Sequence, residues 1–186
     1  MTNHIELSQN IVCEIAAVLN EVDAKEIEAL VNELMQAEKV FIFGVGRVFL
    51  SLKCLGKRLG HLDIDVQVVG AVNEKPIGAK DLLLIGSGSG ESKLPAEIAR
   101  IAKSKGARLG LITASRSSTI KSMSDVVVHL PAPTKFDAAA GIPSVQPMTN
   151  LFDQALHIFG DVVSTIIQQR KGITSEQLWR YHANLE

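Results

Sequence analysis

Nearly uninterrupted apolar runs alternate with segments of helical periodicity along most of this chain. The runs include FIF at 41–43, LLLIG at 82–86, LGLIT at 109–113 and VVV at 126–128. Strands that read as continuous apolar runs are typical of parallel sheets covered on both faces, and the intervening helices supply that cover. The pattern predicts an α/β fold, a three-layer αβα sandwich.

Both ends of the chain carry further helical patterns. Ile11, Ile15, Val18 and Val22 fall on one face of a first helix. A second helix is expected to start at Asp23, with Glu26 in capping-box spacing. Near the C-terminus, Thr174 and Gln177 repeat that spacing.

We expect one domain over residues 1–186, because its length suits a single core. Residues 1–37 are expected to form N-terminal helices and residues 171–186 a tail, both in contacts between copies of the chain.

Composition narrows the function classes. The 186 residues have a net charge of −1 and 46% apolar content, which does not indicate a nucleic-acid-binding protein. The opening residues lack a secretory signal pattern and no apolar run is long enough to span a membrane, so we expect a soluble cytoplasmic protein. Cys13 and Cys54 fit no metal or redox spacing and are expected to be small buried apolar residues.

Two glycine-rich turns follow predicted strands, GVGR at 44–47 and GSGSGES at 86–92. Ligands of open parallel sheets bind beyond the carboxyl ends of the strands, where the strand order reverses. Glycine lets a ligand approach the backbone, and the N-terminus of the following helix favours a phosphate. Ser87, Ser89 and Ser92 can donate to phosphate oxygens, whereas Glu91 should point away from an anion. The second turn therefore predicts an anion site, with a connection that binds nothing as the alternative.

Other motifs with similar glycines do not fit. Phe49 stands where a dinucleotide fingerprint has its third glycine, and neither turn continues into the Gly-Lys-Ser/Thr of a P-loop. Gly88 occupies the centre of the second turn, where a nucleophile elbow has serine. The loop at 131–148 is long for a compact domain, and such loops are usually functional or disordered.

Taken together, GVGR, SGSGES and GLITASRSS resemble the sugar isomerase (SIS) family of phosphosugar-binding domains in order and spacing. The segments KRLGHLDIDVQVVG, SVQPMTNLFDQALHIFGD and RYHANLE resemble 6-phospho-3-hexuloisomerases within that family. The resemblance covers nearly the whole chain. It implies a five-stranded parallel sheet in a flavodoxin-like fold, assembled as a homotetramer.

The resemblance also implies a reaction, the interconversion of 3-hexulose 6-phosphate and fructose 6-phosphate through a cis-enediol. It implies that the Ser-rich turn holds the phosphate and that Asp153, in the position of the family's glutamate, is the proton acceptor. The implied phosphate and substrate residues are Gly46, Arg47, Val48, Ser87, Gly88, Ser89, Gly90, Glu91 and Ser92. Such a proton shuttle needs no metal or cofactor, and the expected partners are a phosphosugar and further copies of the chain.

A donor should stabilise the enediolate oxygens, and the candidates are Arg47, His61 and His182, the last from the same chain or a neighbouring copy. His61 and Asp153 have structural alternatives, because His61 can complement the end of a helix and Asp153 the start of one. His129 and His157 are expected to be structural, and Trp179 and Tyr181 to fix the tail to the body or a neighbour.

The chain departs from the family pattern at four positions. Val48 replaces a serine, and Thr149, Asn150 and Asp153 replace glycine, serine and glutamate. Aspartate retracts the carboxylate by one methylene, and a misplacement of about 1 Å can cost about a hundredfold in rate. Three explanations stay open: a shifted backbone, an isomerase of a different phosphosugar, or a non-catalytic protein that binds a phosphosugar as a regulatory ligand.

Overall fold

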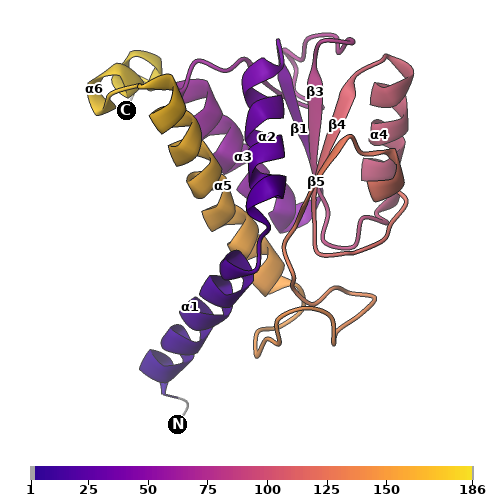
Figure 1. Ribbon diagram of the computed structural model, residues 1–186, viewed down its shortest axis with the longest axis vertical. Helices are drawn as coiled ribbons and strands as arrows, with labels where there is room; N and C mark the ends of the chain where they lie inside the picture. The colour runs from indigo at the N-terminus through magenta and orange to yellow at the C-terminus, as the bar shows by residue number, and fades with distance from the viewer. Residues whose placement is uncertain (1–2, 186) are drawn as a thin grey trace.

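The computed structural model describes residues 3–185, so Met1, Thr2 and Glu186, at the ends of the predicted N-terminal segment and tail, lie outside it. The chain folds into five parallel strands with helices on both faces (Figure 1), which confirms the predicted fold class. The strands are β1 (Val40–Phe43), β2 (Val66–Val68), β3 (Leu82–Gly86), β4 (Arg108–Thr113) and β5 (Val126–His129). The helices are α1 (His4–Asn20), α2 (Ala24–Gln36), α3 (Gly46–His61), α4 (Lys93–Ser104), α5 (Asn150–Lys171) and α6 (Ser175–Leu178), with 3₁₀ turns η1 (Lys121–Met123) and η2 (Trp179–Tyr181).

The strand order is β2-β1-β3-β4-β5. The chain leaves β1 through α3 towards β2 at one edge and leaves β3 through α4 towards the other edge. The order therefore reverses between β1 and β3, and ligands of such sheets bind at that point. Both glycine-rich turns lie there.

Alternate side chains of each strand enter two separate cores. Val40 and Ile42 belong to the larger core, which α2, α3 and α5 cover, whereas Phe41 and Phe43 pack with the alanines of α4. Figure 1 shows α4 alone on one side of the sheet and the other three helices on the opposite side. Continuous apolar strands are thus explained by burial on both faces.

The two N-terminal helices differ in their burial. Helix α2 buries Leu30 and Leu34 completely against the sheet, so its apolar face is already covered within one chain. Helix α1 buries only Val18 and extends beyond the body (Figure 1), with Ile5 57% and Val12 64% exposed. The apolar side chains of α1 are therefore left largely uncovered within one chain.

The capping box predicted at the start of α2 is wrong. Asp23 does cap the helix, accepting from the Lys25 amide at 2.8 Å, but Glu26 accepts instead from the backbone N–H of His129 at 2.7 Å. A contact with β5 therefore takes the glutamate away from the cap. The capping box of Thr174 and Gln177 is confirmed.

The predicted burial of the two cysteines is also wrong, because both are exposed and free. Cys13 lies two positions from both Ile11 and Ile15, about 200° around the helix from each, and therefore on the opposite face. Cys54 lies beside the buried Leu55 of α3 but faces a cavity against α5.

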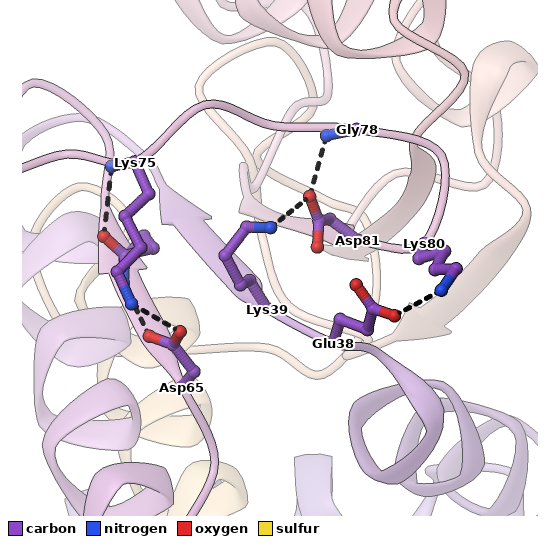
Figure 2. A network of polar contacts seen from close by, with 8 residues as sticks. Glu38, Lys39, Asp65, Lys75, Gly78, Lys80 and Asp81 are labelled. Carbon is purple, nitrogen blue, oxygen red and sulfur yellow. Dashed lines mark hydrogen bonds and ion pairs between the residues drawn. The ribbon is translucent and has the colours of Figure 1, made fainter.

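A polar network ties the connection between β2 and β3 to the amino ends of the strands (Figure 2). Buried Asp81 accepts from the Gly78 amide at 2.7 Å and pairs with Lys39 at 3.1 Å. Lys75 pairs with Asp65 at 2.8 Å. These contacts lie where the strands begin, at the opposite end of the sheet from the glycine-rich turns. They hold the connection in place.

Candidate functional site

The two glycine-rich turns lie beside each other and line one cavity of about 290 Å³. Gly44 and Gly86 lie close together, since a Cβ added to Gly44 would lie 3.3 Å from the Gly86 carbonyl oxygen. Three segments line the cavity: the first turn, the second turn, and the start of α5 with the loop before it. We call it the phosphate cavity, after the ligand that the family resemblance implies for the second turn. The lining residues are Val45, Gly46, Arg47, Val48, Gly86, Ser87, Gly88, Ser89, Ser92, Lys135, Met148, Thr149, Asn150, Phe152 and Asp153.

The second turn is held by its carbonyl groups. The Gly88 carbonyl accepts from the Ala114 amide at 3.0 Å and from the Thr113 hydroxyl at 3.2 Å, both at the end of β4. The N–H groups of Gly88 and Ser89 make no hydrogen bond within residues 3–185. The turn therefore leaves backbone donors available beside the cavity.

Glycine is required at one position of this turn and is closely packed at a second. Gly90 has φ +65°, and a Cβ there would lie 2.1 Å from the hydroxyl oxygen of Ser118. At Gly88 a Cβ would lie 3.3 Å from the ring of Phe152, which lines the same cavity. A side chain at either position would distort the turn or crowd the site.

The three serines of the turn are placed differently. Ser87 and Ser89 are buried, and their hydroxyl oxygens accept from the Gly90 and Glu91 amides, which leaves each hydroxyl proton free to be donated. Ser92 is the N-cap of α4, but its side chain makes no capping hydrogen bond. These hydroxyls and the N-terminus of α4 suit an anion that carries several acceptor oxygens.

Asp153 lies in the first turn of α5 and forms one wall of the phosphate cavity. Its side chain is buried, and Oδ2 lies 3.2 Å from Nε of Arg47 in the first turn of α3. Oδ1 is buried without a hydrogen-bond partner among residues 3–185. The hydroxyl of Ser51 donates to the Asp153 backbone carbonyl at 3.1 Å and so ties α3 to α5 at this point.

Burial raises the pKa of the Asp153 carboxyl above its usual value, and the neighbouring Arg47 only partly offsets that rise. A carboxylate with a raised pKa holds a proton more readily than an exposed one. The geometry thus gives a carboxyl suited to accept and return a proton, beside a cation that can stabilise developing negative charge.

Lys135 belongs to the cavity but was not expected there from the sequence. It is the one cation of the loop at 131–148, and that isolated charge was the available signal. With Arg47 it places two positive charges in a cavity otherwise lined by neutral groups and Asp153.

Gly90 and Glu91 belong to the turn but do not line the cavity. Glu91 points to Thr119, whose amide and hydroxyl donate to its carboxylate at 2.7 and 2.8 Å and lower its pKa. The carboxylate is thereby held away from an anion in the turn.

His61 and His182 lie away from this cavity in a single chain. His61 ends α3, about 22 Å along the helix axis from Gly46. Its ring stacks on that of His182 at 5.2 Å, and the Trp179 ring lies 4.8 Å from that of His182. His182 therefore joins the tail to the end of α3, whereas this ring contact of Trp179 stays within the tail.

Two departures from the family pattern fit their surroundings. Val48 packs against Gly86, where a Cβ would lie 2.7 Å from a Val48 methyl group. Thr149 has φ −111°, an ordinary conformation for threonine, and the left-handed residue of this segment is Met148 at φ +57°. Replacing glycine at 149 therefore does not strain the start of α5.

The two histidines that were expected to be structural, His129 and His157, lie outside the phosphate cavity. His129 is half-buried beside the Ala114 carbonyl, and His157 lines a second cavity described below.

Within the described residues, no group of three or more His, Cys, Asp or Glu side chains could hold a metal ion. Nor is any helix in residues 3–185 long and apolar enough to cross a lipid bilayer.

Comparison with known proteins identifies the family. A model of the SIS domain matches residues 33–158, which include both glycine-rich turns and Asp153. The 3-hexulose-6-phosphate isomerase of Bacillus subtilis (strain 168) is 32% identical over 179 residues, covering 92% of this chain and 97% of that protein. The 3-hexulose-6-phosphate isomerase of Mycobacterium gastri is 34% identical over 186 residues, covering 100% of this chain and 92% of that protein.

A solved structure agrees with these sequence matches. The crystal structure of a hypothetical protein from Methanococcus jannaschii, reported to infer a molecular function of 3-hexulose-6-phosphate isomerase, superposes with a TM-score of 0.83 at 25% identity. The match covers 97% of this chain and 99% of that one. With the fold, both turns and the family model in agreement, the chain belongs to the SIS domain family.

Proposed function

We propose that this chain is a sugar-phosphate isomerase that interconverts 3-hexulose 6-phosphate and fructose 6-phosphate. The observation that carries the proposal is the position of Asp153: a buried carboxyl with a raised pKa in the same cavity as the hydroxyl-rich turn. The relatives named as 3-hexulose-6-phosphate isomerases support the choice of substrate.

The phosphate would lie in the second turn, where amides, hydroxyls and the start of α4 can all donate to its oxygens. Arg47 and Lys135 add positive charge at the rim. Anchoring the phosphate there places the carbon chain beside Asp153, and holding a reactant in position supplies much of the rate of such a reaction.

The chemistry needs one base that acts twice. The carboxylate of Asp153 takes the proton from C2 of the 3-hexulose while the C3 carbonyl oxygen gains a proton, which gives the cis-enediol. The same carboxyl returns its proton to C3 while the C2 hydroxyl loses its proton, which leaves the carbonyl at C2. Arg47 stabilises the negative charge that develops on the oxygens. The enzyme is therefore an intramolecular oxidoreductase, and the shuttle uses no cofactor.

His61 and His182 remain candidates for further acid–base roles. Because they lie at the far end of α3, they would have to come from a neighbouring copy of the chain. The proposal thus includes self-association as a homotetramer, acting in the cytoplasm on a phosphosugar without nucleic acid or membrane.

A second candidate is a non-catalytic protein that binds a phosphosugar as a regulatory ligand. The observation that favours it is the Asp153 side chain, which is one methylene shorter than the family's glutamate and pairs with Arg47 at 3.2 Å. An isomerase of a different phosphosugar is a third possibility with the same site.

The test is an assay of fructose 6-phosphate formation from 3-hexulose 6-phosphate, with thermal shift across a phosphosugar panel beside it. Turnover is the expected result. A folded protein that is stabilised by phosphosugars but turns over none of them would contradict the isomerase and support the regulatory function.

A further inference from the structure

A second cavity adjoins the phosphate cavity, and Arg47 and Asp153 line both. It measures about 530 Å³ and lies between α3 and α5, with Ile15 of α1 at its edge. We call it the α3–α5 cavity. Its size falls within the range of ordinary small-molecule sites. Asp153 thus stands at the boundary between two spaces, only one of which is built for phosphate.

Two adjacent residues that line the α3–α5 cavity carry acceptors that lack donors. Oδ1 of Asp153 and Oε1 of Gln154 are buried, and neither has a hydrogen-bond partner within residues 3–185. Buried polar atoms in native structures are nearly always paired, so two unpaired acceptors on adjacent residues of this wall point to a ligand that brings donors. Sugar hydroxyls are such donors, whereas a phosphate dianion brings none.

His157 supplies a further polar group to the same cavity. It follows Asp153 by four residues on α5, and side chains at this spacing lie on the same face of a helix. Leu50, Cys54 and Ile158 provide apolar surface around it. A sugar carbon chain, with C–H faces and hydroxyl edges, matches this mixture of groups.

We propose that the carbon chain of the sugar phosphate passes from the phosphate cavity across Asp153 into the α3–α5 cavity. There Gln154 accepts from a sugar hydroxyl, and His157 contacts an oxygen at the end of the sugar away from the phosphate. The inference rests on the proposed function, because it assumes that the phosphate occupies the hydroxyl-rich turn. It assigns specificity for the sugar to Gln154 and His157, two residues that make no contact with phosphate.

The test compares two probes, fructose 6-phosphate and inorganic phosphate, by calorimetric titration of the full chain and of Gln154→Leu and His157→Phe. Gln169→Leu, an exposed position on α5 outside both cavities, is the matched control. Each cavity variant should bind fructose 6-phosphate about tenfold more weakly, the value of one lost hydrogen bond, and inorganic phosphate equally well. Equal losses for both probes, or no loss for either, would overturn the subsite.

Cys54 gives a second readout that does not depend on these variants folding. In a Cys13→Ser chain it is the one remaining thiol, and fructose 6-phosphate should slow its alkylation at least tenfold while inorganic phosphate does not. Bound fructose 6-phosphate that leaves the rate unchanged would reject the subsite alone. Failure of fructose 6-phosphate to bind at all would reject the proposed function together with the subsite.

Discussion

The Nε atom of Arg47 lies 3.2 Å from Oδ2 of Asp153, and this contact joins the two helices that begin at the site. Burial disfavours the charged carboxylate of Asp153 and raises its pKa, whereas the Arg47 guanidinium favours the charged form and lowers the pKa. Burial has the larger effect. The pair therefore sets how readily Asp153 exchanges a proton.

Replacing Asp153 with asparagine should reduce turnover about a thousandfold, because the amide cannot accept the carbon-bound proton. Phosphosugar binding, followed by thermal shift, should persist, since the turn proposed to hold the phosphate is untouched. Asp153→Glu is the matched control that keeps a carboxylate and should retain measurable turnover. An asparagine variant that turns over normally would remove Asp153 from the mechanism.

The same variant should be no less stable than the natural chain at pH 7. Because the folded pKa of Asp153 is raised, folding favours its protonated form, and stability falls as pH rises from the usual value of 3.8 through the raised pKa. Asparagine does not titrate, so the free energy of unfolding of the variant should not show this fall as pH rises. Denaturation followed at several pH values measures the difference.

Arg47→Met should move the acidic limb of the pH–rate profile to higher pH. Arg47 lowers the pKa of Asp153, so without it the carboxyl stays protonated to a higher pH and the base forms later. A limb that stays in place or moves to lower pH would contradict this role. Arg116→Met, a cation outside the phosphate cavity, is the control.

Ser92→Ala should weaken phosphosugar binding about tenfold, the value of one hydrogen bond to a charged group. Its stability should change little, because the Ser92 side chain makes no capping hydrogen bond. Titration calorimetry and thermal denaturation separate the two effects. Ser104→Ala, at the other end of α4, should leave binding unchanged.

Gly90→Ala should destabilise the fold by about 2 to 4 kcal/mol, from a positive φ and a clash with Ser118. Urea denaturation measures the change. Gly60→Ala, where a Cβ would meet nothing within 4 Å, is the matched control and should be close to neutral.

The sheet and the position of the glycine-rich turns could be predicted from the sequence, because local patterns determine them. Strands buried on both faces leave an apolar signature, and the glycine-rich turns after β1 and β3 mark the end of the sheet where ligands bind. The contact between Asp153 and Arg47 could not be predicted in this way. The residues are 106 positions apart, and only the packing of α3 on α5 brings them together.

The errors at the cysteines and at Glu26 have physical causes of the same kind. Amino-acid type predicted burial for Cys13, but helical periodicity places it opposite the buried face. Glu26 has the spacing of a capping box, yet β5 offers a competing backbone donor that no local pattern reveals. Lys135 was missed because a lone cation in a long loop has no periodicity to place it.

Incubating the protein with fructose 6-phosphate in D₂O, and following the sugar by NMR, tests the role of Asp153 most directly. A base that shuttles protons between C2 and C3 should exchange the hydrogen on C3 for deuterium, and Asp153→Asn should abolish that exchange. Exchange at C1 instead, or bound sugar with neither exchange at C3 nor conversion to the 3-hexulose, would contradict the proposed isomerisation.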